Sequence, residues 1–184
     1  MARLWLIRHG ETAWSLAGRH TGRTDVPLTA VGERQAELLG RRIATRRLAL
    51  VLTSPLARAR DTCRLSGQLA AAELDHDLVE WDYGAYEGIT TADVRREVPD
   101  WTIWTGGVPG GETAEQVGAR ADRVIARARR ASGDVMLFAH GHLLRILAAR
   151  WLQLPAVGGR LLALDTASLS LLDHERDQPI IRSW

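Results

Sequence analysis

Short apolar runs alternate with longer amphipathic stretches along most of the chain. The runs Leu4–Ile7, Leu48–Leu52 and Val135–Ala139 are each about one strand long and are flanked by polar or turn-forming residues. Such runs predict buried β-strands. The stretch Leu74–Trp81 is ambiguous, and we interpret it as a short strand that runs into a loop.

Between these runs, apolar residues recur at helical spacing, and capping residues stand where helices should begin. Thr29 is the expected N-cap of one helix, and Thr113 with Gln116 has the spacing of a capping box. The pair Ser54-Pro55 is typical of an N-cap followed by the first helical residue. Helices are therefore expected after Thr29, from Pro55 to about Ala71, after Thr113 to about Ala131, and from Leu143 to Leu152.

Strand–helix alternation of this kind predicts an α/β fold with a mainly parallel sheet. The tail Arg160–Trp184 alternates enough to predict further strands, with Asp173–Gln178 as a turn. The region 83–111 is rich in glycine, proline and tryptophan, and we interpret it as a long, partly irregular excursion with a functional role. At 184 residues the chain is expected to form a single domain, 1–184.

Composition narrows the class of protein. A net charge of +2 gives no bulk electrostatic reason to expect nucleic-acid binding. All 24 basic residues are arginine, so any anion site must use guanidinium groups, which bind phosphate in a bidentate way. The single cysteine, Cys63, excludes an intrachain disulfide and is expected in the core. The start of the chain has no leader-like pattern and no apolar run approaches a membrane span, so we expect a cytoplasmic protein without membrane contact.

Residues that could act in catalysis or bind an anion lie where strands end and helices begin. Four such segments are Arg8-His9, Ser54 to Arg58, Glu80, and His140 to His142. In an open α/β sheet, ligands bind beyond the carboxyl ends of the strands. Two histidines, two arginines and a carboxylate suffice for phosphoryl transfer without a metal or cofactor: an imidazole attacks phosphorus, cations neutralise the oxygens, and the acid protonates the leaving group.

Several motifs, in one order along the chain, resemble those of the histidine phosphatase superfamily, whose fold is phosphoglycerate-mutase-like. They are Arg8-His9-Gly10-Glu11-Thr12-Ala13-Trp14, Thr21-Gly22, Pro27-Leu28-Thr29 with Gly32, Ser54-Pro55-Leu56-Ala57-Arg58-Ala59-Arg60-Asp61-Thr62, Leu78-Val79-Glu80 with Tyr83-Gly84 and Tyr86-Glu87-Gly88, and His140-Gly141. The stretch from Glu80 to Gly88, with 101–104 and His140-Gly141-His142, is similar to the branch of acid phosphatases and sedoheptulose-bisphosphatase-like enzymes. The resemblance implies a three-layer α/β/α fold and places the excursion 83–111 over the active site.

The resemblance also implies a role for individual residues. The catalytic group would be His9 as the nucleophile that becomes phosphohistidine, Arg8, Arg58 and His140 as the rest of the phosphate pocket, and Glu80 as the proton donor. Substrate or phosphate contacts would come from Ser15, Thr21, Gly22, Tyr83, Gly141 and His142. Ser15 departs from the family, which often has asparagine there, although a hydroxyl can still donate to phosphate.

Other side chains have competing interpretations. Glu87 is a rival to Glu80 as the acid, but the family places the acid at the Leu-x-Glu position. Glu11 is expected to cap a helix or orient the pocket, and His142 either reaches the substrate or only bonds the loop. Trp101 and Trp104 either line the pocket mouth or, as we prefer, anchor the excursion. The remaining histidines lie in polar stretches and are expected to be solvated: His20, His76 and His174.

The sequence thus predicts a metal-independent phosphatase that hydrolyses small phosphate monoesters, such as sugar phosphates. A phosphoglycerate mutase is the alternative, supported only by Arg95-Arg96 in the excursion, because family mutases carry a longer insertion with a lysine. A zinc hydrolase would use His140-x-His142, but no further ligand follows nearby. A non-catalytic binding module would not need the acid at Glu80. The expected partner is a small phosphorylated metabolite, with a homodimer as a further possibility.

Overall fold

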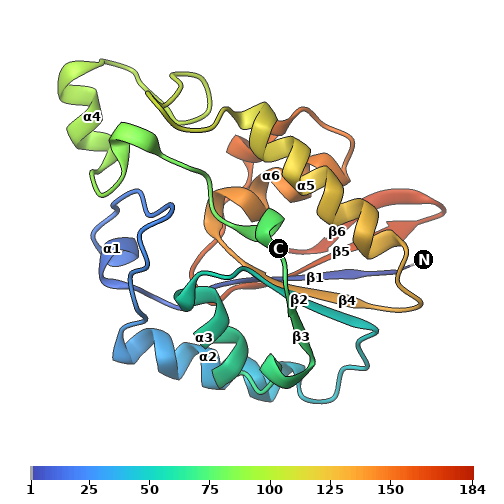
Figure 1. Cartoon of the computed structure of the whole chain (residues 1–184). Coiled ribbons are helices and arrows are strands. Elements are labelled where there is room, and N and C mark those ends of the chain that lie inside the picture. The colour runs from blue at the N-terminus through green and yellow to red at the C-terminus, as the bar shows by residue number, and fades with distance from the viewer. Residues whose placement is uncertain (1) are drawn as a thin grey trace.

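The computed structural model describes residues 2–184 and contains a six-stranded mixed sheet in the order β3-β2-β4-β1-β5-β6 (Figure 1). The first four of these strands in the order run parallel, and the last two pair antiparallel. The mainly parallel sheet predicted from the strand–helix alternation is therefore confirmed. The strands are β1 (Leu4–Arg8), β2 (Leu50–Thr53), β3 (Ala72–Leu74), β4 (Val135–Ala139), β5 (Leu169–Glu175) and β6 (Gln178–Ser183).

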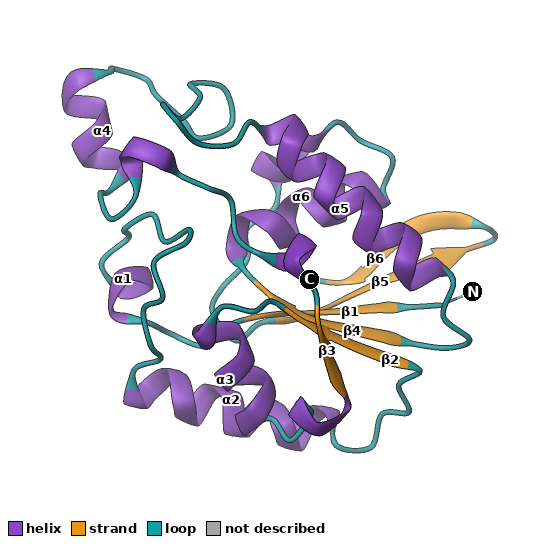
Figure 2. Ribbon diagram, in the orientation of Figure 1, coloured by secondary structure: helices purple, strands orange, loops and turns teal. Residues whose placement is uncertain are grey.

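Helices cover both faces of the sheet, which gives the expected three layers (Figure 2). One face carries α2 (Ala30–Ile43) and α3 (Ala57–Leu65), and the other carries α5 (Ala114–Arg129) and α6 (Gly141–Trp151). Successive side chains along β1 point to opposite faces of the sheet and enter two hydrophobic clusters. Leu4 and Leu6 lie in one cluster, and Trp5 and Ile7 lie in the other. Cys63 is fully buried in the second cluster, as expected.

The predicted helix caps at the starts of α2 and α5 are confirmed. The Thr29 side chain accepts a hydrogen bond from the Gly32 N–H at 3.0 Å. At α5, Thr113 and Gln116 form both bonds of a capping box. These bonds satisfy N–H groups that have no partner inside the helix, so the polar signatures define where the helices begin.

The prediction for α3 was wrong at both ends. The helix begins at Ala57 rather than Pro55, with Leu56 as the N-cap residue. The Ser54 hydroxyl contacts the His140 ring and accepts from the Leu56 N–H before the helix, and the Asp25 carboxylate accepts from the Ala57 N–H. The helix ends at Leu65 rather than near residue 71, since Gly67 takes a left-handed conformation (φ +80°) and closes the helix. The N–H groups of residues 67 and 68 bond back to the carbonyls of residues 64 and 63, which is a Schellman cap.

Other boundaries differ less from expectation. The ambiguous stretch 74–81 holds only the end of β3 and a short 3₁₀-helix, His76–Leu78. The excursion 83–111 contains a 3₁₀-turn and the helix α4 (Thr91–Glu97), and the rest of it is irregular. A 3₁₀-helix at Ala156–Leu161 was not predicted, and the short α1 (Ala13–Leu16) begins after Thr12.

The register of the parallel strands places the candidate site residues next to one another. Arg8 of β1 pairs with Ala139 of β4, and Thr53 of β2 pairs with Phe138 of the same strand. Since these parallel strands end at one edge, the residues that follow them, His9, Ser54 and His140, emerge side by side. In Figure 1, α1 and α4 lie beyond this edge. Within residues 2–184, no helix is long and apolar enough to cross a membrane.

Candidate active site

Two imidazole rings face each other at the carboxyl edge of the sheet. The ring centroids of His9 and His140 are 5.3 Å apart, with a tilt of 57° between the planes. Both side chains are buried, at 5% and 0% exposure. The motifs that follow β1 and β4 therefore converge on one site, as the sequence analysis expected.

The His9 ring has a defined tautomer. Its Nδ1 lies 2.8 Å from the carbonyl oxygen of Gly10, which can only accept a hydrogen bond, so Nδ1 carries the proton. The other nitrogen, Nε2, then holds a lone pair. Burial lowers the pKa of His9 well below its usual range, and the positive charges of Arg58 and Arg8 lower it further. A neutral imidazole with a free Nε2 lone pair is a nucleophile.

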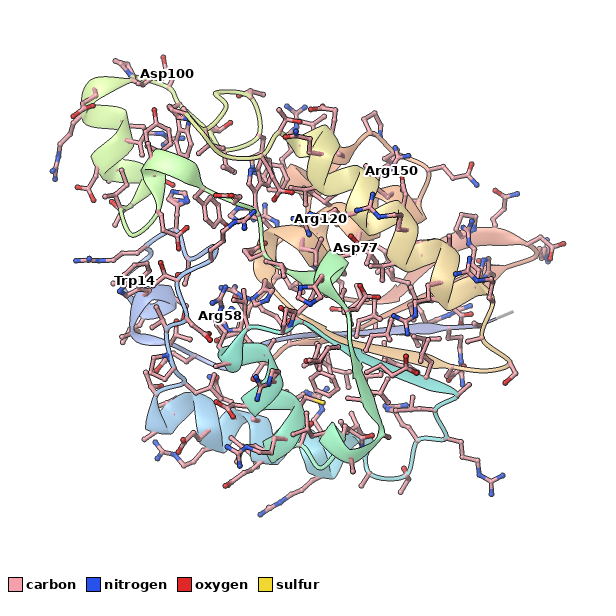
Figure 3. All side chains as sticks on the ribbon, viewed as in Figure 1. Trp14, Arg58, Asp77, Asp100, Arg120 and Arg150 are labelled. Carbon is pink, nitrogen blue, oxygen red and sulfur yellow. The ribbon has the colours of Figure 1, made fainter. Side chains whose placement is uncertain are left out.

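Arg8 and Arg58 flank this ring. Neither arginine forms an ion pair with a carboxylate within residues 2–184. Arg8 donates from Nη1 to the Leu164 carbonyl at 2.5 Å. Arg58 is fully buried and donates to the backbone carbonyls of Thr21, Gly22 and Thr24. In Figure 3 the Arg58 side chain lies at the α1 end of the sheet. Both guanidinium groups are thereby fixed by neutral carbonyls, which leaves their charge available to an anion.

Three buried nitrogens around this point have no hydrogen-bond partner within residues 2–184. They are Arg8 Nε, Arg58 Nε and His140 Nδ1. The opposite nitrogen of His140, Nε2, lies 2.8 Å from the Ser54 hydroxyl, which fixes the ring. Burying a polar nitrogen without a partner costs free energy, and such groups in a native site indicate a ligand that satisfies them. An oxyanion such as phosphate fits two guanidinium N–H groups beside an imidazole.

Glu80 is held at the start of α6. Its carboxylate accepts hydrogen bonds from the backbone N–H groups of Trp81, His142 and Leu143 at 2.9–3.0 Å. Arg120 of α5 donates to the carbonyls of Asp77 and Val79 just before it. The segment that carries Glu80 is therefore fixed from both sides. The rival carboxylate, Glu87, instead accepts from the N–H groups of Gly22 and Thr24, so it orders the loop that follows α1.

Most of the predicted site residues line one cavity of about 210 Å³. Eight predicted site residues line it: Arg8, His9, Ser15, Thr21, Glu80, Tyr83, Gly141 and His142. Arg58, His140 and Gly22 are not in the cavity wall. The Gly22 N–H is already bonded to Glu87, so the structure does not offer that N–H to phosphate. Ser15 uses its hydroxyl in a capping box with Thr12 at the start of α1.

Further residues of the cavity wall were not predicted from the sequence. They are Gly18, Arg19, His20, Thr91, Arg145 and Leu164. Arg145 had a recognisable position, because it follows His142 by three residues and Gly141 by four and therefore faces the same side of α6. His20 was expected to be solvated, and that expectation was wrong. It is 8% exposed and packs against Tyr83 and Trp101, and burial lowers its pKa.

The other two histidines that were expected to be solvated differ in their exposure. His76 is exposed as expected, whereas His174 is half-buried against the Trp151 ring at 4.8 Å between centroids. Glu11 accepts a hydrogen bond from the Thr29 hydroxyl at 2.7 Å, so it is tied to the N-cap of α2. Among residues 2–184, no three His, Cys, Asp or Glu side chains are placed to share a metal ion.

Aromatic residues of the excursion reach this wall. The Tyr83 hydroxyl lies 2.6 Å from His142 Nδ1, and both residues line the cavity. Burial lowers the pKa of His142 well below its usual range, so this ring is neutral. Trp104 packs against His142. Trp101 is 2% exposed, donates from Nε1 to the Gly107 carbonyl within the excursion, and packs against the ring of His20 outside it. Trp101 therefore anchors the excursion, the role preferred for it, and neither tryptophan is part of the cavity wall.

Comparisons with known proteins show what this chain is similar to. The family model of the histidine phosphatase superfamily (branch 1) matches residues 4–184. An acid phosphatase of Mycobacterium tuberculosis is 47% identical over 177 residues, covering 94% of this chain and 87% of that protein. A sedoheptulose 1,7-bisphosphatase of Saccharomyces cerevisiae is 38% identical over 183 residues, covering 81% and 67%. The solved structure of an open reading frame from Mycobacterium tuberculosis has a TM-score of 0.92 and 44% identity, covering 98% of this chain and 95% of that one.

Proposed function

Since this chain belongs to branch 1 of the histidine phosphatase superfamily, we propose that it hydrolyses small phosphate monoesters through a phosphohistidine formed on His9. The observation that carries the proposal is the set of three buried nitrogens without partners, on Arg8, Arg58 and His140, beside the neutral ring of His9. Acid phosphatase and sugar-bisphosphatase relatives support this class of substrate. A cavity of about 210 Å³ suits a small phosphorylated metabolite.

The first half of the reaction forms the phosphoenzyme. The lone pair on His9 Nε2 attacks phosphorus, a P–N bond forms, and the P–O bond to the leaving alcohol breaks. Arg8 and Arg58 offset the charge on the phosphoryl oxygens, and His140 donates a hydrogen bond. Glu80 gives its proton to the leaving oxygen, so the alcohol departs neutral.

The second half returns the enzyme to its starting state. Glu80, now a carboxylate, takes a proton from a water molecule, and the water oxygen attacks phosphorus as the P–N bond breaks. Inorganic phosphate leaves, and Nε2 of His9 regains its lone pair. No metal or cofactor enters this sequence of steps, so activity is expected to persist in excess chelator, an outcome that a zinc hydrolase would not give.

Trapping the intermediate tests the proposal. The protein is mixed with a ³²P-labelled phosphate monoester and quenched in alkaline detergent, because phosphohistidine is labile in acid. We expect label on the wild type that is lost on acid treatment, no label on His9→Ala, and normal label on the control His76→Ala, which alters an exposed histidine. Unlabelled wild type, or full turnover by His9→Ala, would refute the mechanism.

A parallel assay separates hydrolysis from transfer. Release of inorganic phosphate from 3-phosphoglycerate is compared with the appearance of 2-phosphoglycerate in the same reaction. We expect hydrolysis to exceed isomerisation, because the exposed residues Arg95 and Arg96 of α4 do not line the cavity. Predominant isomerisation would support a mutase.

A further inference from the structure

The Ser54 hydroxyl lies beside the second imidazole of the site. Ser54 follows β2 directly, and its N–H donates to the Phe138 carbonyl of β4 at 2.9 Å, which continues the pairing of the two strands. His140 follows β4 and is the N-cap residue of α6. Both residues are 0% exposed, and the Ser54 Oγ atom lies 2.8 Å from His140 Nε2. The backbones of two neighbouring strands therefore fix this contact.

The partners of the Ser54 hydroxyl show which group donates in this contact. A serine hydroxyl has one hydrogen to donate, and its oxygen can accept. Ser54 Oγ already accepts from the Leu56 N–H at 3.3 Å. Its only other hydrogen-bond partner within residues 2–184 is His140 Nε2, so this nitrogen is the acceptor available to the hydroxyl hydrogen. A buried O–H without an acceptor costs free energy, which favours donation from Ser54 to Nε2.

The direction of this hydrogen bond decides which nitrogen of His140 carries a proton. Burial lowers the pKa of His140 well below its usual range, and the charge of Arg58 lowers it further, so the ring is neutral and has a single N–H. When Nε2 accepts from Ser54, that N–H is on Nδ1. Nδ1 is buried without a partner within residues 2–184, and it is the nitrogen left to donate to an oxyanion. In the reversed arrangement Nδ1 would present a lone pair, which repels an anion.

We propose that Ser54 is a positioning residue whose hydroxyl keeps His140 in the Nδ1–H tautomer, so that His140 donates to the phosphoryl group and does not compete with His9 as the nucleophile. His9 is the same tautomer but exposes the other nitrogen, because its Nδ1–H is bonded to the Gly10 carbonyl at 2.8 Å and its Nε2 keeps the lone pair. The inference rests on the proposed function, which supplies the phosphoryl group. It adds the residue that gives two neighbouring buried imidazoles different roles.

Nitrogen NMR of the resting enzyme tests the tautomer without turnover. The protein is labelled with ¹⁵N in its histidine rings, and long-range ¹H–¹⁵N spectra at pH 7.5 distinguish protonated from unprotonated ring nitrogens. Comparison with the spectrum of His140→Gln identifies the signals of His140. We expect Nδ1 of His140 to be protonated and Nε2 to be unprotonated in the wild type, and we expect inorganic phosphate to shift the Nδ1–H signal.

Variants of Ser54 connect the tautomer to the chemistry. Ser54→Ala removes the donor, so the Nε2–H tautomer of His140 should gain population. The value of kcat/KM for p-nitrophenyl phosphate should then fall by about 10- to 100-fold, because a hydrogen-bond donor to the phosphoryl oxygens is lost in much of the enzyme. Ser54→Thr keeps a hydroxyl and should retain the Nδ1–H tautomer and most of the activity.

Ser66→Ala is the matched control. Ser66 is the C-cap residue of α3, is 4% exposed and donates to the Cys63 carbonyl at 2.9 Å. The substitution therefore removes a buried serine hydrogen bond outside the cavity wall. We expect an unchanged His140 spectrum and a kcat/KM within about twofold of the wild type. Thermal unfolding establishes that each variant is folded, and the wild-type spectrum decides the tautomer without any variant.

Two results would overturn the inference. One is a wild type in which Nε2 of His140 carries the proton. The other is a folded Ser54→Ala variant that keeps the Nδ1–H tautomer, whatever its activity, because Ser54 would then be only a structural contact. Neither result depends on catalysis: a failed phosphohistidine trap refutes the proposed function, whereas the wrong tautomer in the resting enzyme refutes only the role of Ser54.

Discussion

Arg120 of α5 and Glu112 are joined by two hydrogen bonds of 2.8 Å, and the two side chains also bond to the backbone on either side of Glu80. Arg120 donates to the carbonyls of Asp77 and Val79 on one side. On the other side, the Glu112 carboxylate accepts from the Asp82 N–H at 3.0 Å. Figure 3 shows Arg120 on α5 directed at the segment that carries Asp77. The pair is therefore a positioning device for the carboxylate proposed to protonate the leaving group.

Replacing Arg120 with methionine should make the rate depend on the leaving group. An alkyl phosphate needs a proton on its departing oxygen, so a displaced Glu80 should slow its hydrolysis by about 10- to 100-fold. p-Nitrophenolate leaves without a proton, and its release should slow by only a few-fold. The measurement is kcat for the two substrates, together with thermal unfolding of the variant.

Arg123→Met is the matched control for that experiment. Arg123 bonds the side chain of Asp77 from the same helix but is more than half exposed and touches no carbonyl near Glu80. We expect its kcat ratio between the two substrates to equal that of the wild type. An equal loss on both substrates in Arg120→Met would show a general structural defect rather than a positioning role.

The pH dependence of phosphoenzyme formation follows from the environment of His9. Burial and the charges of Arg58 and Arg8 lower its pKa, so the ring stays neutral and nucleophilic as the pH falls past 6.5. We expect the single-turnover rate with p-nitrophenyl phosphate to change by less than about twofold between pH 7 and 5.5. A nucleophile of ordinary pKa would be about 90% protonated at pH 5.5, and its rate would fall about tenfold.

The strand–helix order could be predicted because it depends on local patterns. The apolar runs became β1, β2 and β4 within two residues of their predicted ends, and the caps at Thr29 and Thr113 were correct. The family match over residues 4–184 confirms the family that the ordered motifs indicated. The predicted start of α3 was wrong, and the contacts made there are tertiary: the Ala57 N–H donates to the Asp25 carboxylate, 32 residues away, and Ser54 bonds the His140 ring, 86 residues away.

Other features of the site also depend on contacts between distant segments. His20 lies in a polar stretch, and nothing local indicates that Tyr83 and Trp101 enclose it. The positions of Arg120 and Arg145 on helices are visible in the sequence. Two of their partners, Glu112 and Trp104, come from the irregular excursion and its flank, however, and an irregular segment has no periodicity from which its contacts could be derived.

Stability should fall on mild acidification because several histidines are buried in the neutral form. His9, His20, His140 and His142 all have pKa values lowered by burial. Between the lowered pKa and the usual 6.5, the unfolded chain binds more protons, so the free energy of unfolding decreases as the pH falls. Each such histidine contributes a slope of up to about 1.4 kcal/mol per pH unit.

Replacing His20 isolates one of these contributions. His20→Gln removes a titrating ring that is outside the proposed chemistry, so the slope of unfolding free energy against pH below 6.5 should become shallower than in the wild type. Urea unfolding at pH 7.5, 6.5 and 5.5 measures the slope for both proteins. Carboxylates contribute equally to both curves and cancel in the difference. Parallel curves would mean that His20 does not change its protonation on folding.

The substitution Gly32→Ala has two opposing effects on stability: alanine has the higher helix propensity, but its Cβ would meet the backbone of a neighbouring segment. Gly32 lies in the first turn of α2, where alanine is ordinarily favoured over glycine by about 1 kcal/mol. A Cβ there, however, would lie 2.2 Å from the Glu11 carbonyl oxygen, and a Cβ on Gly10 would lie 2.5 Å from the Gly32 oxygen. Both contacts are with backbone, which cannot rotate away as a side chain can.

The close contact of the new Cβ with the Glu11 backbone should outweigh the gain in helix propensity. We expect Gly32→Ala to lower the free energy of unfolding by about 1–3 kcal/mol, as overpacking does, and to reduce kcat because the Glu11 segment follows His9 directly. Urea unfolding and the p-nitrophenyl phosphate assay measure the two effects. Glu33→Ala, on the exposed side of the same helix turn, should change stability by less than about 0.5 kcal/mol. A stabilised Gly32→Ala would show that α2 can move away from the His9 loop without loss, so that its packing does not hold the nucleophile in place.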